Sequence, residues 1–152
     1  MRILLASLAM VTALDGQVFA QPTWTATCEV PVGNRYDQVN GKIKESHDDF
    51  TDVHPLFVLD DEKPGKLLLI WGATKRAREL GRQTKAEEAT VVSRSSEKIT
   101  AILIDSSAPA LVEMFSLYPS KGLVFYTKHG NPSIAGVGPF TATFHAQCKF
   151  SR

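Results

Sequence analysis

Histidine and carboxylate residues gather in one short polar stretch of this chain, and they are its first candidates for metal chemistry. Imidazole nitrogen and carboxylate oxygen are both ligands that zinc accepts. Their spacing matches no compact ligand motif, and no thiolate accompanies them. The stretch Ser46–Asp52 is therefore interpreted as a solvated acidic loop, and we expect no metal and no cofactor. The residues of this group are His47, Asp48, Asp49, Asp52 and His54.

Serine and histidine residues are the second candidates, because together they form a nucleophile and its base in many hydrolases. Ser106 or Ser107 would be the nucleophile, with His129 or His145 as the base. Neither serine lies in a G-x-S-x-G sequence, which would hold it on a sharp turn. The sequence therefore favours a non-catalytic binding protein, such as an inhibitor or a small carrier. The alternative is a hydrolase whose site is assembled from residues distant in the chain.

A basic run is the local charge bias that stands out. It comprises Lys75, Arg76, Arg78, Arg82 and Lys85, of which the first four are the candidate binding residues. Guanidinium and ammonium groups bind carboxylates and phosphates, so the run is a candidate site for an acidic protein or an anionic small molecule. A solvated loop that aids solubility is the alternative. No aromatic residues are interleaved with the run, and the formal net charge is only +1. Both features argue against nucleic acid as a partner.

The first twenty residues have the pattern of a secretory signal peptide. A positive charge at Arg2 precedes the apolar stretch Ile3–Leu14, and Val18-Phe19-Ala20 places small residues at the cleavage positions. The apolar stretch is too short to span a bilayer. We therefore expect a mature chain that begins at Gln21 and works in the periplasm or outside the cell, without a membrane span.

Cysteine usage fits that compartment. The chain has two cysteines, Cys28 and Cys148, near opposite ends of the expected mature chain. In an oxidising environment an isolated pair most simply forms a disulfide. The alternatives are two free thiols or a redox pair, but the C-x-x-C spacing that lowers a thiol pKa is absent.

Two stretches alternate cleanly between apolar and polar residues, which predicts strands with one buried face. They are Thr23–Val30 and Phe140–Phe150, and in each the cysteine lies on the apolar side. A disulfide between them would therefore lie in the core and join the first strand to the last. If those strands are neighbours, the sheet is closed or nearly closed, which also removes its exposed edges.

The segments between these strands predict a single all-β domain over residues 21–152, with about eight strands in a small antiparallel barrel or sandwich. Lys98–Gly130 is expected to hold the folding core, without identifiable chemistry. Lys66–Trp71 is apolar throughout, which predicts a central strand covered on both faces. The other predicted strands are Tyr36–Lys44 with a turn at Asn40-Gly41, Leu56–Leu59, Thr90–Ser93, Ile99–Ile104, Val112–Leu117 and Leu123–His129.

Four connecting segments complete this interpretation. Pro31–Asn34 is expected to be a turn, and Asn131–Pro139 a flexible connector rich in glycine and proline. Thr74–Lys85 is interpreted as a strand extension with a long basic loop, although its residue types also suit a helix. Ser107–Leu117 is interpreted as strand, with a helix capped by Ser107 as the alternative.

The expected processing is directly measurable. Protein recovered from the periplasm or medium should begin at Gln21 and carry a Cys28–Cys148 bridge. Intact-mass spectrometry with and without reductant tests both features, since reduction should add the mass of two hydrogens. Recovery of two alkylatable thiols without reduction would contradict the bridge, and a retained residue 1–20 segment would contradict the signal peptide.

Overall fold

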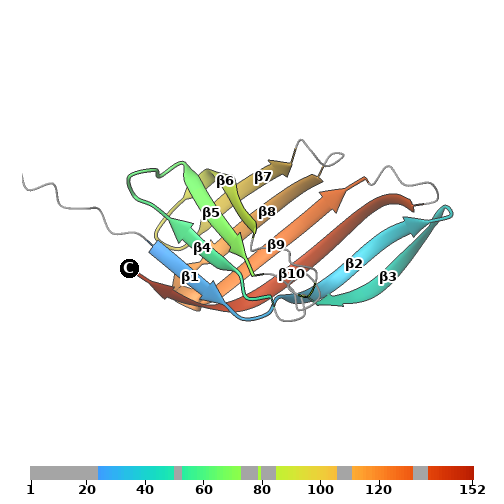
Figure 1. The fold of residues 1–152 in the computed structure, drawn as a ribbon, viewed down its shortest axis with the longest axis horizontal. Coiled ribbons are helices and arrows are strands. Elements are labelled where there is room, and N and C mark those ends of the chain that lie inside the picture. The colour runs from blue at the N-terminus through green and yellow to red at the C-terminus, as the bar shows by residue number, and fades with distance from the viewer. Residues whose placement is uncertain (1–23, 50–52, 73–78, 80–84, 106–110, 132–136) are drawn as a thin grey trace, which may run out of the picture.

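The computed structural model describes residues 24–49, 53–72, 79, 85–105, 111–131 and 137–152. The expected signal peptide lies outside these residues, as do the four candidate binding residues of the basic run and the two candidate serines. Within them the chain forms ten strands and one short 3-10 turn (Figure 1). The strands are β1 (Trp24–Cys28), β2 (Val32–Val39), β3 (Lys42–Asp49), β4 (Leu56–Leu59), β5 (Lys66–Trp71), β6 (Lys85–Arg94), β7 (Ile99–Asp105), β8 (Leu111–Tyr118), β9 (Leu123–Gly130) and β10 (Val137–Ser151).

Eight of these strands, β1 and β4–β10, close into an antiparallel barrel, and β2 and β3 extend the sheet beyond it. The all-β barrel prediction is therefore confirmed. Neighbours in the barrel follow chain order from β4 to β10, and closure comes from β1, which pairs with both β4 and β10. No helix of the described part of the chain is long and apolar enough to cross a membrane.

The disulfide lies at the point of closure, as the alternating pattern predicts. β1 and β10 pair from Thr25 opposite Ser151 to Cys28 opposite Cys148. The two cysteines are directly cross-strand neighbours, with their Cα atoms 4.0 Å apart and their sulfurs bonded. Cys28 is buried, so the bridge belongs to the side of the barrel wall that faces the core. The first and last strands are thus linked both by backbone pairing and by a covalent bond.

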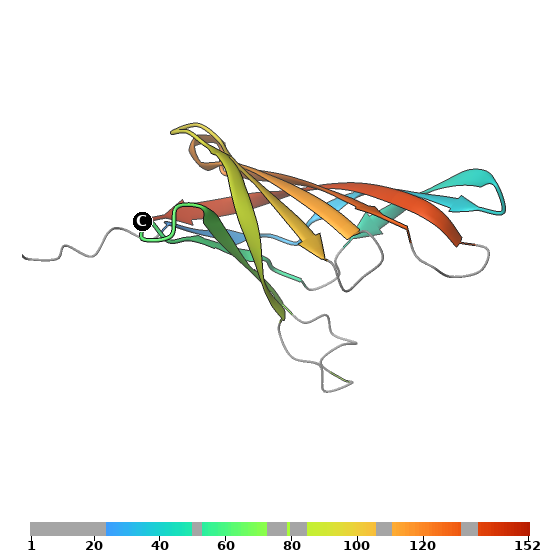
Figure 2. The ribbon, with the colours of Figure 1, turned by 90° about the horizontal axis from the view of Figure 1, so that it is seen from above.

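One edge of the long strand β10 serves two partners. Its first part pairs with β2, from Val137 to His145, and its last part pairs with β1. Between the two partners lies Pro31, which is fully buried and interrupts the pairing because it lacks a backbone N–H. On one side of Pro31, β1 also pairs with β4 and closes the barrel. On the other side, β2 extends away from the barrel and forms a hairpin with β3 (Figures 1 and 2).

Gly33 permits the close approach of β2 to β10. A Cβ atom at this position would lie 1.9 Å from the carbonyl oxygen of Thr143 and 2.8 Å from the Cα of Phe144. Both atoms belong to the backbone of β10, so no side-chain rearrangement could relieve the overlap. The glycine is therefore required where the sheet divides into barrel and hairpin.

Inward-facing residues fill the barrel in the predicted alternation. Phe144 is buried, as are the alanines at 142 and 146 on the same face of β10. Its ring stacks on Tyr126 of β9 at 4.6 Å between centroids, and Tyr126 stacks on Phe115 of β8 at 5.5 Å. Phe57 of β4 meets Phe115 edge-on from the opposite wall, at 5.8 Å. The aromatic side chains thus form the centre of the core.

Two hairpins join strands that the sequence predicts. Asn40 and Gly41 have φ values of 50° and 74° and join β2 to β3 as a two-residue turn. Positive φ at both positions is the type I′ geometry that matches strand twist, and Asn-Gly is its preferred sequence. β8 turns into β9 through the 3-10 turn Pro119–Lys121. This pairing confirms strand over helix for the described part of Ser107–Leu117.

Four sequence expectations about strand bounds and burial are wrong. Pro31–Asn34 is not a turn, since β2 begins at Val32, and Ser46–Asp49 is strand rather than loop. Both segments have few apolar residues, but a hairpin that extends a sheet needs backbone pairing rather than a buried face. Lys66–Trp71 is covered on one face only: Leu67 and Leu69 are buried and Leu68 is exposed. β10 begins at Val137, so Gly138 and Pro139 are part of a strand with irregular register.

The close approach at Gly33 can be tested with a matched pair of substitutions. Gly33→Ala should destabilise the protein by several kcal/mol, because the new methyl group overlaps backbone that cannot move independently. Gly65→Ala is the control, since no atom lies within 4 Å of its Cβ position and its φ is not positive. Urea denaturation measures both free energies of unfolding. Equal midpoints for the two variants would show that β2 does not approach β10 so closely.

Candidate functional site at the open end of the barrel

Ionisable and aromatic side chains surround a cavity of about 190 Å³ at one end of the barrel. We call this cavity and its lining the mouth. A volume of this size equals about six water molecules at about 30 Å³ each, so it could hold one side chain or one small ring. Four strands, β5, β6, β8 and β9, supply the lining, which consists of Trp71, Lys85, Glu87, Leu111, Glu113, Tyr126 and Lys128.

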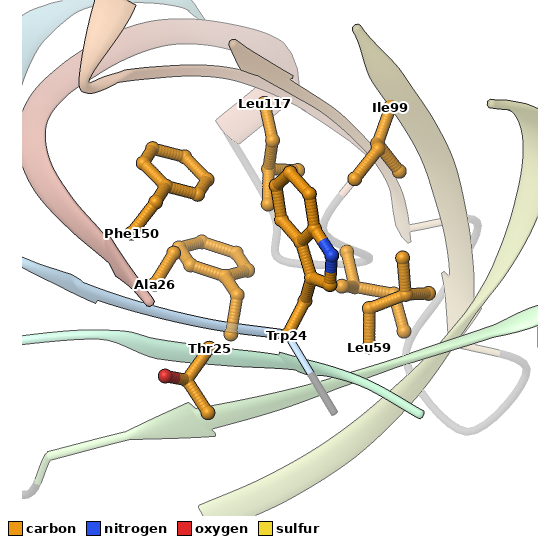
Figure 3. Close-up of a pocket in the computed structure, with 9 residues that line it drawn as sticks. Trp24, Thr25, Ala26, Leu59, Ile99, Leu117 and Phe150 are labelled. Atoms are coloured by element: carbon orange, nitrogen blue, oxygen red, sulfur yellow. The ribbon is translucent and has the colours of Figure 1, made fainter. Parts of the chain in front are cut away.

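The opposite end of the barrel is filled. Apolar residues, including Trp24, Leu59, Ile99, Leu117 and Phe150, enclose a space of only about 10 Å³ there (Figure 3). That space holds about one water molecule at most. A larger hollow of about 370 Å³ beside Trp24, Phe150 and Arg152 is open to solvent. The described residues therefore form no interior chamber for a ligand at this end, which we call the closed end.

Aromatic rings separate the two ends and form the floor of the mouth. Tyr126 lies between Phe115 and Phe144 in the stack described above, and Trp71 approaches Tyr126 at 5.6 Å and Phe115 at 6.3 Å. Trp71 is the last residue of β5, so its ring is held against the stack at the edge of the cavity. A ligand entering the mouth would meet apolar ring surface below and charged groups around it.

Glu113 is buried in the mouth and paired with a lysine on the next strand. It occupies an inward position of β8, two residues before Phe115, and Lys128 of β9 lies directly opposite it. The Lys128 Nζ is 3.0 Å from the Glu113 Oε1, and the exposed fractions of the two side chains are 30% and 6%. A buried carboxylate needs such a partner, because transfer of an unpaired charge out of water is very unfavourable.

A second ion pair stands across the mouth on β6. Lys85 and Glu87 are two residues apart and lie on the same face, with the Lys85 Nζ 2.5 Å from the Glu87 Oε1. The hydrogen bond to Glu87 raises the pKa of Lys85 despite the opposing effect of burial, and the charges of Asp105 and Glu113 add to this. Lys85 is therefore cationic at neutral pH. Its side chain is 63% exposed, against 14% for Glu87.

Tyr126 presents a neutral phenol to the mouth. Burial raises the pKa of its hydroxyl far above the usual value, and the nearby charge of Glu113 raises it further. Both causes disfavour a phenolate, because burial removes the hydration of an anion and a neighbouring carboxylate repels it. Among the described residues, the charged groups that line the mouth are the two ion pairs, in which the lysine side chains are more exposed than the glutamates.

The four candidate binding residues of the basic run lie outside the described residues, but the chain fixes where their segment begins and ends. β5 ends at Trp71 and β6 begins at Lys85, and both residues line the mouth. Lys75, Arg76, Arg78 and Arg82 therefore belong to a segment that starts and finishes at this opening.

The candidate metal residues point in different directions. His47 faces Asn34, at 3.4 Å between Nδ1 and Oδ1, whereas Asp48, the next residue of β3, faces the other side of the sheet. His54 lies 3.2 Å from the carbonyl oxygen of Cys28. Among the described residues, no three histidine, cysteine or carboxylate side chains are placed to hold a metal. Asp52 and the side chain of Asp49 fall outside this description.

The candidate general bases lie on the outer surface. The His129 Nδ1 is 3.1 Å from the Thr141 Oγ1, and the His145 ring lies 6.2 Å from that of Phe125. Both histidines point away from the barrel interior, on the face opposite to Tyr126 and Phe144. Their proposed serine partners lie outside the described residues, so this pairing stays a prediction.

Glu113 and Lys128 were not expected as site residues, because Lys98–Gly130 was interpreted as core without chemistry. The signal was a glutamate at an inward position of an otherwise apolar alternation, Leu111, Glu113, Phe115 and Leu117. Register in the β8–β9 hairpin then places Lys128 opposite that glutamate. A buried carboxylate with a cross-strand lysine is thus recognisable once the turn is located.

Comparisons with protein-family models, with curated proteins and with solved structures find no match to this chain. A functional proposal therefore rests on the side chains of the mouth.

A double-mutant cycle tests the Glu113–Lys128 pair. Lys128→Met should destabilise the protein by about 3 kcal/mol, because it leaves a buried carboxylate unpaired. Glu113→Gln should destabilise the protein less, because the ammonium group of the partly exposed Lys128 can reorient into solvent. The double variant should lose less free energy of unfolding than the two single variants lose together. The difference is the coupling energy, expected at about 0.5–3 kcal/mol from urea denaturation. Additive losses would show that the two groups do not interact.

Proposed function

We propose that this protein is an exported, non-catalytic binding module whose mouth receives an acidic group of a partner protein or of a small anionic ligand. The observation that carries the proposal is the layering of charge in the mouth. Glu87 and Glu113 lie deep, and the ammonium groups of Lys85 and Lys128 lie outside them. An incoming carboxylate or phosphate would therefore meet the cations first.

The deep carboxylates favour this role because they hold the lysines in place. A free lysine side chain loses about 2 kcal/mol of rotamer entropy when it is fixed. Here the ion pairs already restrict Lys85 and Lys128, while each ammonium keeps further N–H groups for a ligand. Trp71 supplies an apolar surface next to them, against which the ligand's carbon skeleton could pack.

The candidate cations Lys75, Arg76, Arg78 and Arg82 support the same type of partner. They lie in the chain between Trp71 and Lys85, and both of these residues line the mouth. Cations around an opening raise the association rate of an anionic partner, and the effect weakens with salt. The predicted loop and the mouth thus support one type of partner.

The filled interior supports recognition at the surface over transport of a ligand inside the barrel. Ligand-carrying cavities usually measure about 300–1,000 Å³. The mouth, at about 190 Å³, suits one group of a larger partner. Export is supported by the Cys28–Cys148 bridge, because such bonds persist in oxidising compartments.

A charge-neutral set of substitutions tests the mouth. The variant K85M/E87Q/E113Q/K128M removes both ion pairs and leaves the net charge unchanged. With poly-glutamate as the probe, we expect it to bind about tenfold more weakly than wild type, equal to about 1.4 kcal/mol. The matched control is K66M/E88Q, which removes the outer ion pair between Lys66 and Glu88 and should bind as wild type does.

Salt and the basic run provide the second arm of this experiment. Binding should weaken at 1 M salt, where the screening length falls to about 3 Å. Replacement of Lys75, Arg76, Arg78 and Arg82 by alanine should weaken it as well. Equal binding by wild type and the mouth variant would contradict the proposed site. A hydrolytic turnover that survives repurification would contradict the non-catalytic assignment.

A further inference from the structure

The outer strand of the hairpin, β3, has a free edge. Among the described strands it alone pairs on one side only, with β2, while every other strand has neighbours on both sides. The closed barrel therefore does not remove every exposed edge, contrary to the sequence-based expectation. Figures 1 and 2 show β3 at the margin of the sheet, with no described element beyond it. Such an edge is a template for pairing with another strand.

The turn geometry determines which residues of β3 present backbone groups at this edge. In a two-residue type I′ hairpin the residues that flank the turn, here Val39 and Lys42, form a hydrogen-bonded pair. Bonded pairs then alternate along the ladder. The even-numbered residues of β3 bond to β2, and the odd-numbered residues, including Ile43, Glu45 and His47, direct their N–H and C=O groups outward.

Charge along β3 is separated by sign. Lys42 and Lys44 lie near its start, and Asp48 lies near its end. Edges that are protected against pairing commonly carry lysines, a proline or a bulge. β3 carries Lys42 and Lys44, but it has no proline, and its register with β2 is unbroken from Val32–Asp49 to Val39–Lys42. A strand of this pattern repels a parallel copy of itself and complements an antiparallel one.

We propose that β3 pairs antiparallel with β3 of a second copy of this chain, about a two-fold axis through Ser46. In this register Lys44 of each copy lies opposite Asp48 of the other, on the face that carries Arg35 and Asp37. On the other face, Glu45 lies opposite His47 of the second copy. The second pair uses the outward backbone groups and is hydrogen-bonded. The first is a non-hydrogen-bonded pair, in which side chains approach most closely.

The side chains of β3 are already arranged for this register. Glu45 accepts a hydrogen bond from the Tyr36 hydroxyl at 3.1 Å, and His47 lies beside Asn34. Both are thereby held on one face, where the second copy's His47 and Glu45 would meet them. Lys44 and Asp48 share the opposite face by the period of the strand.

Other symmetric registers are less favourable. A two-fold axis perpendicular to the sheet keeps each face of the strand on the same side of the sheet, so the register can change only in steps of two residues. Each such step moves the axis by one residue along β3. Moving the axis by one residue toward the turn places Glu45 opposite Glu45 of the second copy, and a further step places Lys44 opposite Lys44. Like charges directly opposite destabilise a strand pair. Moving the axis away from the turn separates Lys44 from Asp48. Of the registers compared, the one with the axis at Ser46 is therefore favoured.

Charge reversal provides a strict test. Lys44→Glu and Asp48→Lys each create repulsion at two symmetric places, so each variant alone should be monomeric. Mixed together, the two variants should form a heterodimer. The residue at position 44 of each variant then lies opposite a residue of opposite charge at position 48 of the other variant. Sedimentation velocity over micromolar to millimolar concentrations, at low salt, measures all three samples beside wild type, which should dimerise.

A backbone variant gives an independent arm. Glu45→Pro removes one outward N–H but none of the hydrogen bonds to β2, so it should yield a folded monomer. Circular dichroism and thermal melting verify its fold. Wild type that stays monomeric over the whole range would overturn the proposal. So would dimerisation of Lys44→Glu alone, of Glu45→Pro, or failure of the two charge variants to associate.

Discussion

The pairing of β1 with β10 is the constraint on which this barrel depends. A short ladder joins the two strands, from Thr25–Ser151 to Cys28–Cys148, yet it closes a sheet of eight strands. The disulfide reinforces this ladder by joining residues 120 positions apart. Cross-linking a loop of that length stabilises a fold by about 4–5 kcal/mol in the chain-entropy model. Without closure, the inward faces of β1 and β4 would lose their contact with β10, and the aromatic floor of the mouth would lose its opposite wall.

The division of the sheet at β10 links closure to the hairpin. Because β1 and β2 share one edge of β10, the chain must leave that edge at Pro31 and return to it tightly at Gly33. The same division that lets the barrel close also carries β3 away from any further neighbour among the described strands. Stability of the barrel and availability of the β3 edge are therefore two results of one arrangement. The lining of the mouth comes from other strands, β5, β6, β8 and β9, but Phe144 of β10 supports the aromatic floor beneath it.

The sequence predicts those parts of the fold that have a buried face. Alternation in β1 and β10 indicates strands, places both cysteines inside and predicts that the first and last strands meet, because burial imposes a period of two. The Asn40-Gly41 turn locates the middle of the β2–β3 hairpin, but alternation fails for residues 32–35 and 45–49, whose polar character resembles a loop. Their strand structure comes from pairing with β10 and with each other, which leaves no mark in hydropathy. The ion pair of Glu113 and Lys128 was missed for a related reason: its meaning depends on register across the β8–β9 turn, and neither residue is unusual by itself.

The two ends of the described domain lie together at the closed end of the barrel. Trp24 begins β1, its ring packs against Phe150, and the guanidinium of Arg152 lies 4.8 Å above it. The Thr25 and Ser151 hydroxyls meet at 2.6 Å, so the chain enters and leaves at neighbouring points. The mouth lies at the far end of the same barrel. A label, a solid support or a fused domain attached at either end would consequently stand behind the barrel, and the mouth would be displayed outward from it.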